Sequence, residues 1–529
     1  MTETIRKTIK DSAAMRWFVL ILISALLFST YWFQDFYGGL KGLMESEMGF
    51  TSEEFGRMIG LTTIANMFGM IIVGGIILDK WGIRVAGLIF GGMAVLGGAI
   101  SALASAGYFG QDHSTMLNMM IVGRIFFGSG LEVICVVATR TIVKWFKGYE
   151  LALAMAINMG FGRLGSAMGI ALSGDIAGGH VSAAVSFAAT LIAITLLFFV
   201  IYLVFDIKLD KQLKAEKSGD ADEDEEFKFS DLFKLISNKS FLYIALLCVS
   251  FYVAVFPFMQ YAPDLLINKF NFTSELSAQG NIILFGSSTL GNASVYLMFF
   301  IFAIAFSVVP GKIQEKTNRT IYFVVIIAAF IAYIYGIHTQ LQLWLNNGQK
   351  TASLIPVGSI FFTPIFGNFV DKKGKAASLM ILGALLLIFA HISLSLFNNV
   401  YLAYAGLLSL GIAFSLVPAA MWPSVSKIVS ESRLGTAYAT MFTIQNWGLG
   451  LFFWGIGALL DFVNKGNITA IRNGEAVYDY TIPILVLVVC GVVSIFLAFK
   501  LKRADLKQGY GLELPSSAIA PRDIEGFKK

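Results

Sequence analysis

The sequence predicts an all-α polytopic membrane protein, and three observations support this fold class. The chain has 529 residues, of which 57% are hydrophobic and only 14% are charged, whereas a soluble domain carries about 25% charged residues. Its mean hydropathy is +0.74. Many apolar runs exceed the roughly 18 residues that a membrane-spanning helix needs, and their continuity excludes the alternating pattern of a β-barrel strand.

The first half of the chain contains apolar runs for six helices. Each run is long enough to cross a bilayer, and together they predict an N-terminal six-helix bundle at 1–205. An acidic loop is expected at 39–52, between the first two helices. The expected helices cover residues 15–38, 54–78, 85–104, the two arms of a hairpin at 123–165, and 181–205.

A charged stretch at 206–240 follows, with an acidic block at 220–226 and a short amphipathic segment, FSDLFKLI, near its end. Such a stretch is typical of a cytoplasmic linker that ends in an interfacial helix. After it we expect a second bundle at 241–505 and a cytoplasmic tail at 506–529. The expected helices cover 241–265, a run that ends in FGNFVDKKGK at 366–375, 376–397, 401–421, 435–462 and 482–501.

Two additional apolar runs, at 294–309 and 321–335, lie between the seventh and eighth helices. They are separated by the basic segment GKIQEKTNR, and within 278–350 they predict an inserted transmembrane hairpin. The hairpin brings the expected number of spans to about fourteen. Because the runs come as a pair, they leave the sidedness of the later helices unchanged.

Lys and Arg residues near the helix ends predict the orientation of the chain. With the N-terminus inside, the inner loops are basic, and the outer loops between helices 3 and 4, 5 and 6, and 9 and 10 carry no Lys or Arg. Both termini and the linker are therefore expected to be cytoplasmic. The basic residues of the inner loops are Lys80, Arg84, Lys144, Lys147, Lys312, Lys316, Arg319, Lys372, Lys373, Lys375, Lys427 and Arg433.

Glu132 and Arg163 are charged residues deep inside the two arms of the hairpin at 123–165. A charge near a bilayer midplane costs at least ~2.5–3.5 kcal/mol, so it normally faces protein or a water-filled cavity. On antiparallel arms the two residues could bind a zwitterion, with its ammonium at Glu132 and its carboxylate on the guanidinium of Arg163. Two alternatives are open: Glu132 pairs with Arg163 and braces the bundle, or Glu132 pairs with Arg124.

The pattern G-x-x-x-D-K-x-G occurs twice, at the ends of the second and eighth expected helices. A repeat in two halves joined by a charged linker is typical of a two-bundle secondary transporter. We expect the repeated loops to act in conformational gating. Their residues are Gly75, Asp79, Lys80, Gly82 and Arg84 in the first copy and Gly367, Asp371, Lys372 and Gly374 in the second.

These loops resemble the signature loop of the major facilitator superfamily, and Arg124, Gly128 and Gly130 match its R-x-x-x-G-x-G segment. The resemblance implies two pseudo-symmetric six-helix bundles, to which the inserted hairpin is an addition. Further segments are similar to the lysosomal dipeptide-transporter branch of this superfamily. They are WFKGYE at 145–150, GRLGSA at 162–167, YVAVFPF at 252–258, FVDKKGK at 369–375, AAMWPSV at 419–425 and LGTAYATMFTIQNWGLG at 434–450.

In that branch an acid on helix 4 and an arginine on helix 5 hold the two ends of a peptide, so the resemblance implies that Glu132 and Arg163 bind substrate. It also implies contributions from four further residues in matching segments. Two of them have plainer interpretations, Asp35 as a solvated acid at a helix end and Trp422 as a packing or interface residue. The four are Asp35, Tyr252, Trp422 and Asn446.

The predicted function is secondary-active or facilitative transport of a small zwitterionic solute, above all a dipeptide, across a lipid bilayer. The expected transport unit is a monomer, to which an accessory subunit could bind. Alternatives are a proton-coupled symporter of organic anions or sugars and a non-transporting receptor or assembly partner. No catalytic residue, cofactor, metal site or nucleic-acid partner is expected. The N-terminal residues lack a dileucine-type sorting signal, which favours a microbial plasma (inner) membrane over the lysosomal alternative.

Overall fold

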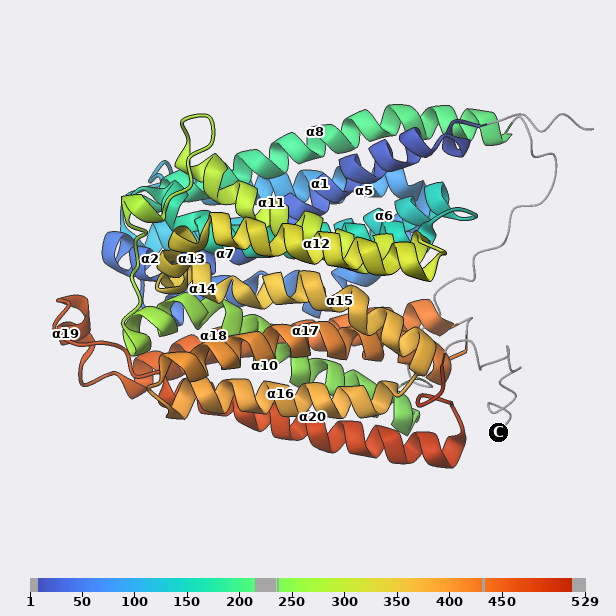
Figure 1. Cartoon of the computed structure of the whole chain (residues 1–529). Helices are drawn as coiled ribbons and strands as arrows, with labels where there is room; N and C mark the ends of the chain where they lie inside the picture. The colour runs from blue at the N-terminus through green and yellow to red at the C-terminus, as the bar shows by residue number, and fades with distance from the viewer. Residues whose placement is uncertain (1–7, 215–234, 236, 431–432, 516–529) are drawn as a thin grey trace, which may run out of the picture.

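Long apolar helices make up most of the computed structural model, which describes residues 8–214, 235, 237–430 and 433–515. Within those residues, twelve helices are long and apolar enough to cross a membrane. Helices are favoured in a bilayer because they satisfy their own backbone hydrogen bonds without water. The predicted all-α membrane fold is therefore confirmed (Figure 1).

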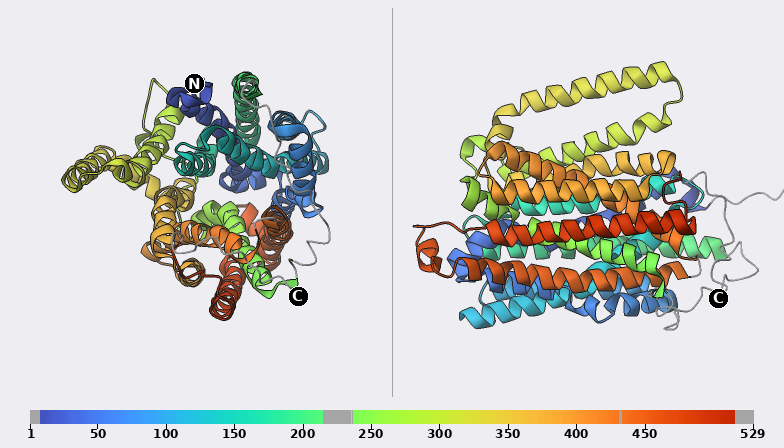
Figure 2. Two further views of the ribbon diagram at one scale, coloured as in Figure 1. Left: turned by 90° about the vertical axis from the view of Figure 1, so that its right-hand side faces the viewer. Right: turned by 90° about the horizontal axis from the view of Figure 1, so that it is seen from below.

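The helices form two groups, one from each half of the chain (Figures 1 and 2). The N-half contains η1 (Ile9–Asp11), α1 (Ala13–Asp35), η2 (Phe36–Leu40), α2 (Lys41–Met48), α3 (Ser52–Leu61), α4 (Ile64–Met67), α5 (Met70–Ser105), α6 (His113–Phe146), α7 (Leu151–Ala177) and α8 (Val181–Lys214). The C-half contains α10 (Lys239–Phe270), η3 (Ala278–Gly280), α11 (Ser288–Ser307), η4 (Val309–Lys312), α12 (Lys316–Gly336), α13 (His338–Leu345), α14 (Gly348–Ala352), α15 (Leu354–Lys373), α16 (Ala376–Leu396), α17 (Val400–Ile428), α18 (Leu434–Val463), α19 (Ile468–Arg472) and α20 (Thr481–Gln508).

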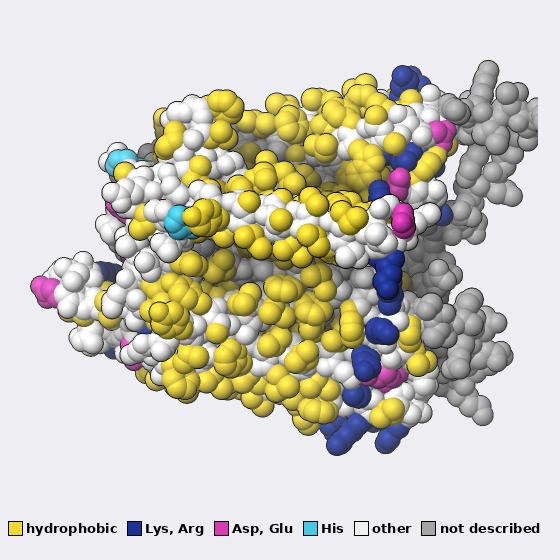
Figure 3. Space-filling view, viewed as in Figure 1, with side chains coloured by type: hydrophobic (Ala, Val, Ile, Leu, Met, Phe, Trp, Pro, Cys, Tyr) yellow, Lys and Arg dark blue, Asp and Glu magenta, His cyan; other side chains and the backbone are white. Residues whose placement is uncertain are grey.

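The start of α1 and the end of α20 lie at the same end of the molecule, at the right of Figure 1, which we call the terminus side. The opposite end is the far side. On the face shown in Figure 3, Lys and Arg side chains gather at the terminus side, while hydrophobic side chains cover the middle. The positive-inside rule assigns such a basic end to the cytoplasm, and the orientation of the chain stays a prediction.

The element α5 reverses direction at Gly82, where the backbone has φ +78° and is no longer helical. Glycine is favoured there because a side chain would be strained at positive φ. Before Gly82 the element runs parallel to α6, and after Gly82 it runs antiparallel to α6. It therefore forms two separate spans, which correspond to the expected second and third helices. The contacts that show this are Gly74 with Val133 and Asp79 with Arg140, and then Phe90 with Gly130 and Gly97 with Gly123.

The expected second helix, at 54–78, is not continuous. It is divided into α3, α4 and the first arm of α5, with breaks after Leu61 and at Gly69, whose φ is +88°. The prediction of one unbroken helix was wrong because hydropathy averages over the polar residues Thr62, Thr63 and Asn66. Irregular backbone at membrane depth is tolerated where it is buried in protein or lines a cavity, and this segment does line the cavity described below.

Polar contacts clasp the two halves together at the far side. The loop expected at 39–52 contains α2, whose buried Lys41 bonds to Asp264 of α10 at 2.9 Å and to Glu45 at 2.7 Å. The far-side clasp has two further parts across the seam, one an ion pair and the other a carboxylate that accepts from backbone N–H groups. They are Lys350 of α14 with Asp175 of α7 at 2.5 Å, and Asp461 of α18 with the backbone N–H groups of Ser52 and Glu53 at the start of α3.

The helix α8 continues to Lys214, past the start of the expected linker at residue 206. Its extension is held because Asp206, which is 1% exposed, bonds to Arg84 and Lys144, each at 2.7 Å. The acidic block and nearly all of the amphipathic segment of the expected linker lie outside the described residues, as does the tail after residue 515.

The helices α11 and α12 occupy the position of the inserted hairpin (Figure 2). α11 packs against both halves: Phe300 meets Phe161 of α7 edge-on at 5.0 Å, and Phe299 lies 6.3 Å from Phe361 of α15. α12 lies outside α11 and has no buried residue. Long, apolar and uncovered, α12 has the character of a lipid-facing helix.

We predict that the α11–α12 hairpin crosses the membrane and returns, with its connecting segment on the terminus side. A cysteine at the exposed Gln314 should then react with an impermeant maleimide only from the side on which the chain termini are labelled, because GKIQEKTNR cannot rest in the bilayer.

A cysteine at Phe285, which is 92% exposed in the far-side loop before α11, is the matched control and should react from the opposite side. The parent protein gives the background, since Cys248 and Cys490 are buried. Labelling of both positions from one side would contradict the predicted hairpin.

Candidate functional site

A cavity of about 180 Å³ lies between the two halves. The N-half contributes residues from α1, the broken segment after α3, α6 and α7, and the C-half contributes residues from α10, α17 and α18. Such a position, between bundles and lined by residues of both, is typical of a transporter binding site. The lining residues are Tyr31, Gln34, Thr62, Thr63, Asn66, Leu131, Glu132, Met159, Arg163, Tyr252, Phe256, Trp422, Phe442, Gln445, Asn446, Leu449 and Phe453.

Arg163 enters the cavity from α7 without an ionic partner among the described residues. Its guanidinium carbon lies 3.9 Å from the ring centre of Phe414, a cation–π contact with α17. Its Nη1 is buried and has no hydrogen-bond acceptor. Leaving a buried donor unpaired costs about 1–3 kcal/mol, and more for a charged group, so Arg163 is prepared to receive an anionic group.

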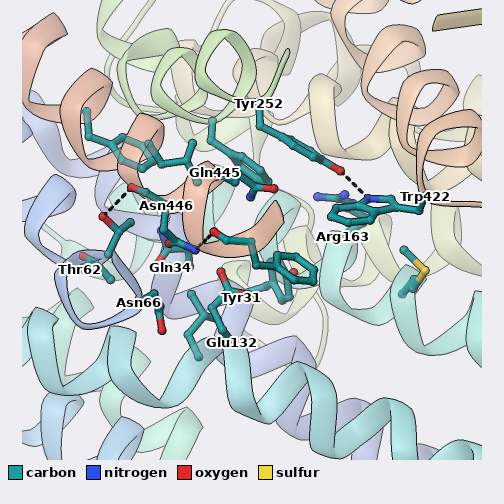
Figure 4. A pocket seen from close by; sticks show the side chains of 17 residues that line it. Tyr31, Gln34, Thr62, Asn66, Glu132, Arg163, Tyr252, Trp422, Gln445 and Asn446 are labelled. Atoms are coloured by element: carbon teal, nitrogen blue, oxygen red, sulfur yellow. Dashed lines mark hydrogen bonds between the residues drawn. The ribbon is translucent and has the colours of Figure 1, made fainter. Parts of the chain in front are cut away.

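Glu132 lies on a different part of the cavity wall from Arg163 (Figure 4). In the part of the chain that the structure describes, no ion pair joins Glu132 to Arg163 or to Arg124. Both bracing alternatives were therefore wrong for this conformation. The side chain of Asn446 approaches the Glu132 carboxylate, and the acid and the base line the same cavity as separate charges.

Aromatic side chains from the C-half form the wall that faces these charges. Trp422 donates from Nε1 to the hydroxyl of Tyr252 at 3.0 Å and stacks on Phe442 with ring centres 4.9 Å apart. Tyr252 in turn stacks on Phe256 at 5.3 Å. Trp422 and Tyr252 line the cavity, and their substrate-binding role stays a prediction. Their aromatic faces suit an apolar or cationic part of a ligand.

Asn446 lines the cavity, whereas Asp35 does not. Asn446 accepts a bond at its backbone oxygen from Thr63 at 3.3 Å, across the seam between the halves. Asp35 is 1% exposed and accepts bonds from Ser166 at 2.5 Å and from Gln260 at 3.0 Å. It lies outside the set of lining residues, so both the binding role and the solvated helix-end interpretation disagree with its position.

The break between α3 and α5, which includes the short helix α4, is a part of the site that the sequence analysis missed. It brings Thr62, Thr63 and Asn66 to the cavity wall. The signal was present in the sequence, since three polar residues stand within five positions, 62–66, of the apolar segment GLTTIANMFG. Polar residues inside a spanning segment mark functional positions by default.

The helix 4 motif holds this break in place. Arg124, which is 0% exposed, donates to the Thr62 hydroxyl at 2.8 Å and to the Phe33 carbonyl of α1 at 2.9 Å. At Gly128 a Cβ would lie 1.8 Å from the Thr62 carbonyl oxygen, so only glycine permits the approach. Gly130 makes a similar close contact with Phe90. The three motif residues therefore shape the site without lining it.

The repeated loops lie at the terminus side, away from the cavity. In the first, Asp79 pairs with Arg140 of α6 at 2.5 Å, and Arg84 holds Asp206 and Asp210 of α8. Lys80, Asp371 and Lys372 belong to the same loops. Space is open around Gly75 and Gly367, where an added Cβ would meet nothing within 4 Å. The second loop turns at Gly374, with φ +71°, against the backbone of residues 513–514.

Within the described ranges, His, Cys, Asp and Glu side chains nowhere form a group of three or more that could hold a metal ion. The polar groups of the cavity are instead one acid, one base, and amides and hydroxyls. Such a set suits an organic ligand with charges of both signs.

Comparison with known proteins gives consistent matches along the chain. The sequence model of the Major Facilitator Superfamily matches residues 26–349, more than half of the chain. The lysosomal dipeptide transporter MFSD1 of Danio rerio is 26% identical over 456 residues, which are 84% of this chain and 80% of that protein. The protein of the same name from Mus musculus is 27% identical over 470 residues, 86% of this chain and 82% of that protein.

Solved structures share the fold at low sequence identity. A bacterial homologue of the human lysosomal transporter Spinster, in an inward-facing, unoccupied conformation, superposes with a TM-score of 0.60 at 12% identity, covering 94% of this chain and 98% of that one. The nucleoside transporter NupG gives 0.54 at 15% identity, covering 92% and 99%. A D-xylose–proton symporter gives 0.56 at 13% identity, covering 93% and 97%.

We predict that Gly128→Ala destabilises the protein, because the added methyl group overlaps the Thr62 carbonyl. Forced overpacking typically costs about 1–3 kcal/mol. The measurement is the apparent melting temperature of the purified protein in detergent. Gly75→Ala is the matched control, a helical glycine with open space around it, and should leave the melting temperature unchanged or slightly raised. Equal melting temperatures for the two variants would contradict the close contact at Gly128.

Proposed function

Because this chain belongs to the Major Facilitator Superfamily, we propose that it carries a small zwitterionic solute, and specifically a dipeptide, across a membrane by alternating access. The proposed binding site is the cavity between the halves. Glu132 binds the ammonium group of the solute and Arg163 binds its carboxylate. Tyr252, Trp422 and Asn446 contact the part of the solute between them.

The observation that carries the proposal is the unpaired state of Arg163. Its buried Nη1 has no acceptor, and Glu132 lines the same cavity without closing an ion pair to it. A carboxylate at Arg163 would gain a charge-assisted bond, and the planar guanidinium allows two such bonds in parallel. A neutral sugar would satisfy neither charge, and a simple organic anion would satisfy only one.

The names of the relatives support the same solute class. At 26–27% identity over most of the chain, the MFSD1 proteins are called dipeptide transporters. The nucleoside and D-xylose transporters resemble this chain in fold alone, at 13–15% identity. The word lysosomal in the relatives' names also supports a lysosomal membrane as the location, in place of the microbial plasma membrane expected from the sequence.

We further propose that this conformation opens toward the terminus side. The far-side clasp closes the opposite end with ion pairs between the halves, and the cavity lies between that clasp and the open surroundings of Gly75 and Gly367. Alternating access would then require the clasp to separate while the repeated loops approach each other. Whether transport is facilitative or coupled to protons is decided by flux measurements at fixed pH gradients.

We predict that Arg163→Ala weakens binding of alanyl-alanine by about 10- to 100-fold, since a charge-assisted bond contributes about 1.5–3 kcal/mol. Glu132→Gln should weaken binding of the free dipeptide but leave N-acetyl-alanyl-alanine nearly unaffected, because that ligand has no ammonium. Affinities are measured calorimetrically on purified protein, with D-xylose as a ligand that is expected not to bind.

The melting temperature of each ligand-free variant is measured alongside as a control for folding. Breaking a structural ion pair would cost about 3–5 kcal/mol whatever the ligand, whereas loss of a ligand contact leaves the fold intact. Folded variants that bind free and acetylated dipeptides with the relative affinity of the parent would rule out the proposed roles of Glu132 and Arg163.

We predict that Asp79→Ala slows transport in proteoliposomes while substrate affinity stays within a few-fold of the parent. The reason is that the Asp79–Arg140 pair lies in the terminus-side loop, where it biases the conformational equilibrium without touching the ligand. Glu475→Ala, which removes an exposed far-side acid, is the control and should leave the rate unchanged. A large loss of affinity with a normal transport rate would contradict a gating role.

A further inference from the structure

We propose that Asn66, in the break between α3 and α5, is a specificity-determining residue whose side-chain oxygen accepts an N–H from the ammonium of the solute. This inference rests on the proposed dipeptide function and extends it. It assigns a second contact to the amino end of the ligand, beside Glu132, and gives the broken helix a role in recognition. Asn66 is 1% exposed and lines the cavity.

The hydrogen bonds around Asn66 fix which end of its amide is free. Nδ2 donates to the carbonyl oxygen of Gly128 at 3.1 Å. That carbonyl can only accept, so the NH₂ end of the amide must point toward it. The other end, Oδ1, is buried and has no donor among the described residues. Asn66 therefore presents a pure acceptor, and a ligand that donates an N–H is the complement it lacks.

The position of Asn66 places this acceptor near the proposed ammonium site. Gly128 and Glu132 are four residues apart on α6, and residues at that spacing lie on the same face of a helix. Asn66 is bonded to the first of them, and both Asn66 and Glu132 line the cavity. In the view of Figure 4, the labelled side chains of Asn66 and Glu132 appear next to each other, and Arg163 is apart from both.

The residues just before Asn66 are fixed by hydrogen bonds of their own. The Thr63 hydroxyl donates to the backbone oxygens of Gly60 and Asn446, and the Thr62 hydroxyl accepts from Arg124. These bonds hold the segment in place, so the free acceptor cannot relax easily toward another partner. A primary ammonium has three N–H donors, of which a carboxylate at Glu132 and the amide oxygen at Asn66 can take two.

The test compares two ligands on the full-length protein in detergent, alanyl-alanine and propionyl-alanine, which lacks the amino group. The quantity measured is the ratio of their dissociation constants. Asn66→Ala should reduce the preference for the free amino group about tenfold, because it removes one bond to a charged donor. Asn66→Asp should retain the preference, since either protonation state keeps an acceptor oxygen.

Gln349→Ala is the matched control. Gln349 is also a buried amide with an unpaired Oε1, but it lies outside the cavity lining, so its loss should leave the ratio unchanged. A purely structural role for Asn66 would weaken both ligands equally, and an unchanged ratio in Asn66→Ala would overturn the proposal. If the parent protein binds neither ligand, the dipeptide function fails and the role of Asn66 fails with it.

A measurement on the parent protein keeps the proposal testable should Asn66→Ala not fold. N,N,N-trimethyl-alanyl-alanine keeps the positive charge but has no N–H on it. We expect it to bind at least about tenfold more weakly than alanyl-alanine. Equal affinity for these two ligands would overturn the assigned bond while leaving the charge pairing at Glu132 intact.

Discussion

The hydrogen bonds of the buried Arg124 guanidinium are the interaction on which the site depends. A charged group away from water must have its donors satisfied inside the protein. Arg124 meets this requirement by binding the Thr62 hydroxyl and the Phe33 carbonyl. In doing so it joins α1 and α6 to the broken segment after α3. Replacing Gly128 with a larger residue would keep α6 from approaching the broken segment, because the added side chain would overlap the Thr62 carbonyl.

Arg124 and Arg163 show how one residue type serves two purposes in the same bundle. Arg124 has three hydrogen-bond partners, two on α1 and one in the broken segment after α3, and is structural. Arg163 has an aromatic ring beneath it and an unpaired Nη1. The difference comes from the helices that pack around each arginine. The residue type is the same, and both arginines lie inside apolar segments. An unsatisfied buried donor is costly, and such costs are retained where a ligand relieves them.

The far-side clasp and the helix α11 both contact the two halves at the seam between them. The clasp uses buried ion pairs, Lys41 with Asp264 and Lys350 with Asp175, which need close geometry to offset the loss of hydration. The cost of removing both charges from water offsets much of their attraction, so returning them to water costs little net free energy. Such pairs therefore suit a seam that opens and closes. α11 covers the seam between α7 and α15 from the side, with Asn292 bonded to Asp175.

The sequence by itself determined the fold class and the family, because long apolar runs and repeated loop motifs are local properties. It also identified Glu132, Arg163, Tyr252, Trp422 and Asn446 as residues that the structure places in one cavity. Those residues stand in segments with a recognisable pattern, and a charge in an apolar run is conspicuous without knowledge of its neighbours.

Only the tertiary structure decided which groups meet. It separated Glu132 from Arg163, placed Asp35 against Ser166 and Gln260 outside the cavity, and divided the second helix so that Asn66 reaches the wall. Each of these outcomes depends on contacts between residues distant in the chain. Hydropathy and spacing describe one segment at a time, whereas the pairing of a buried polar group is set by whatever helix packs against it.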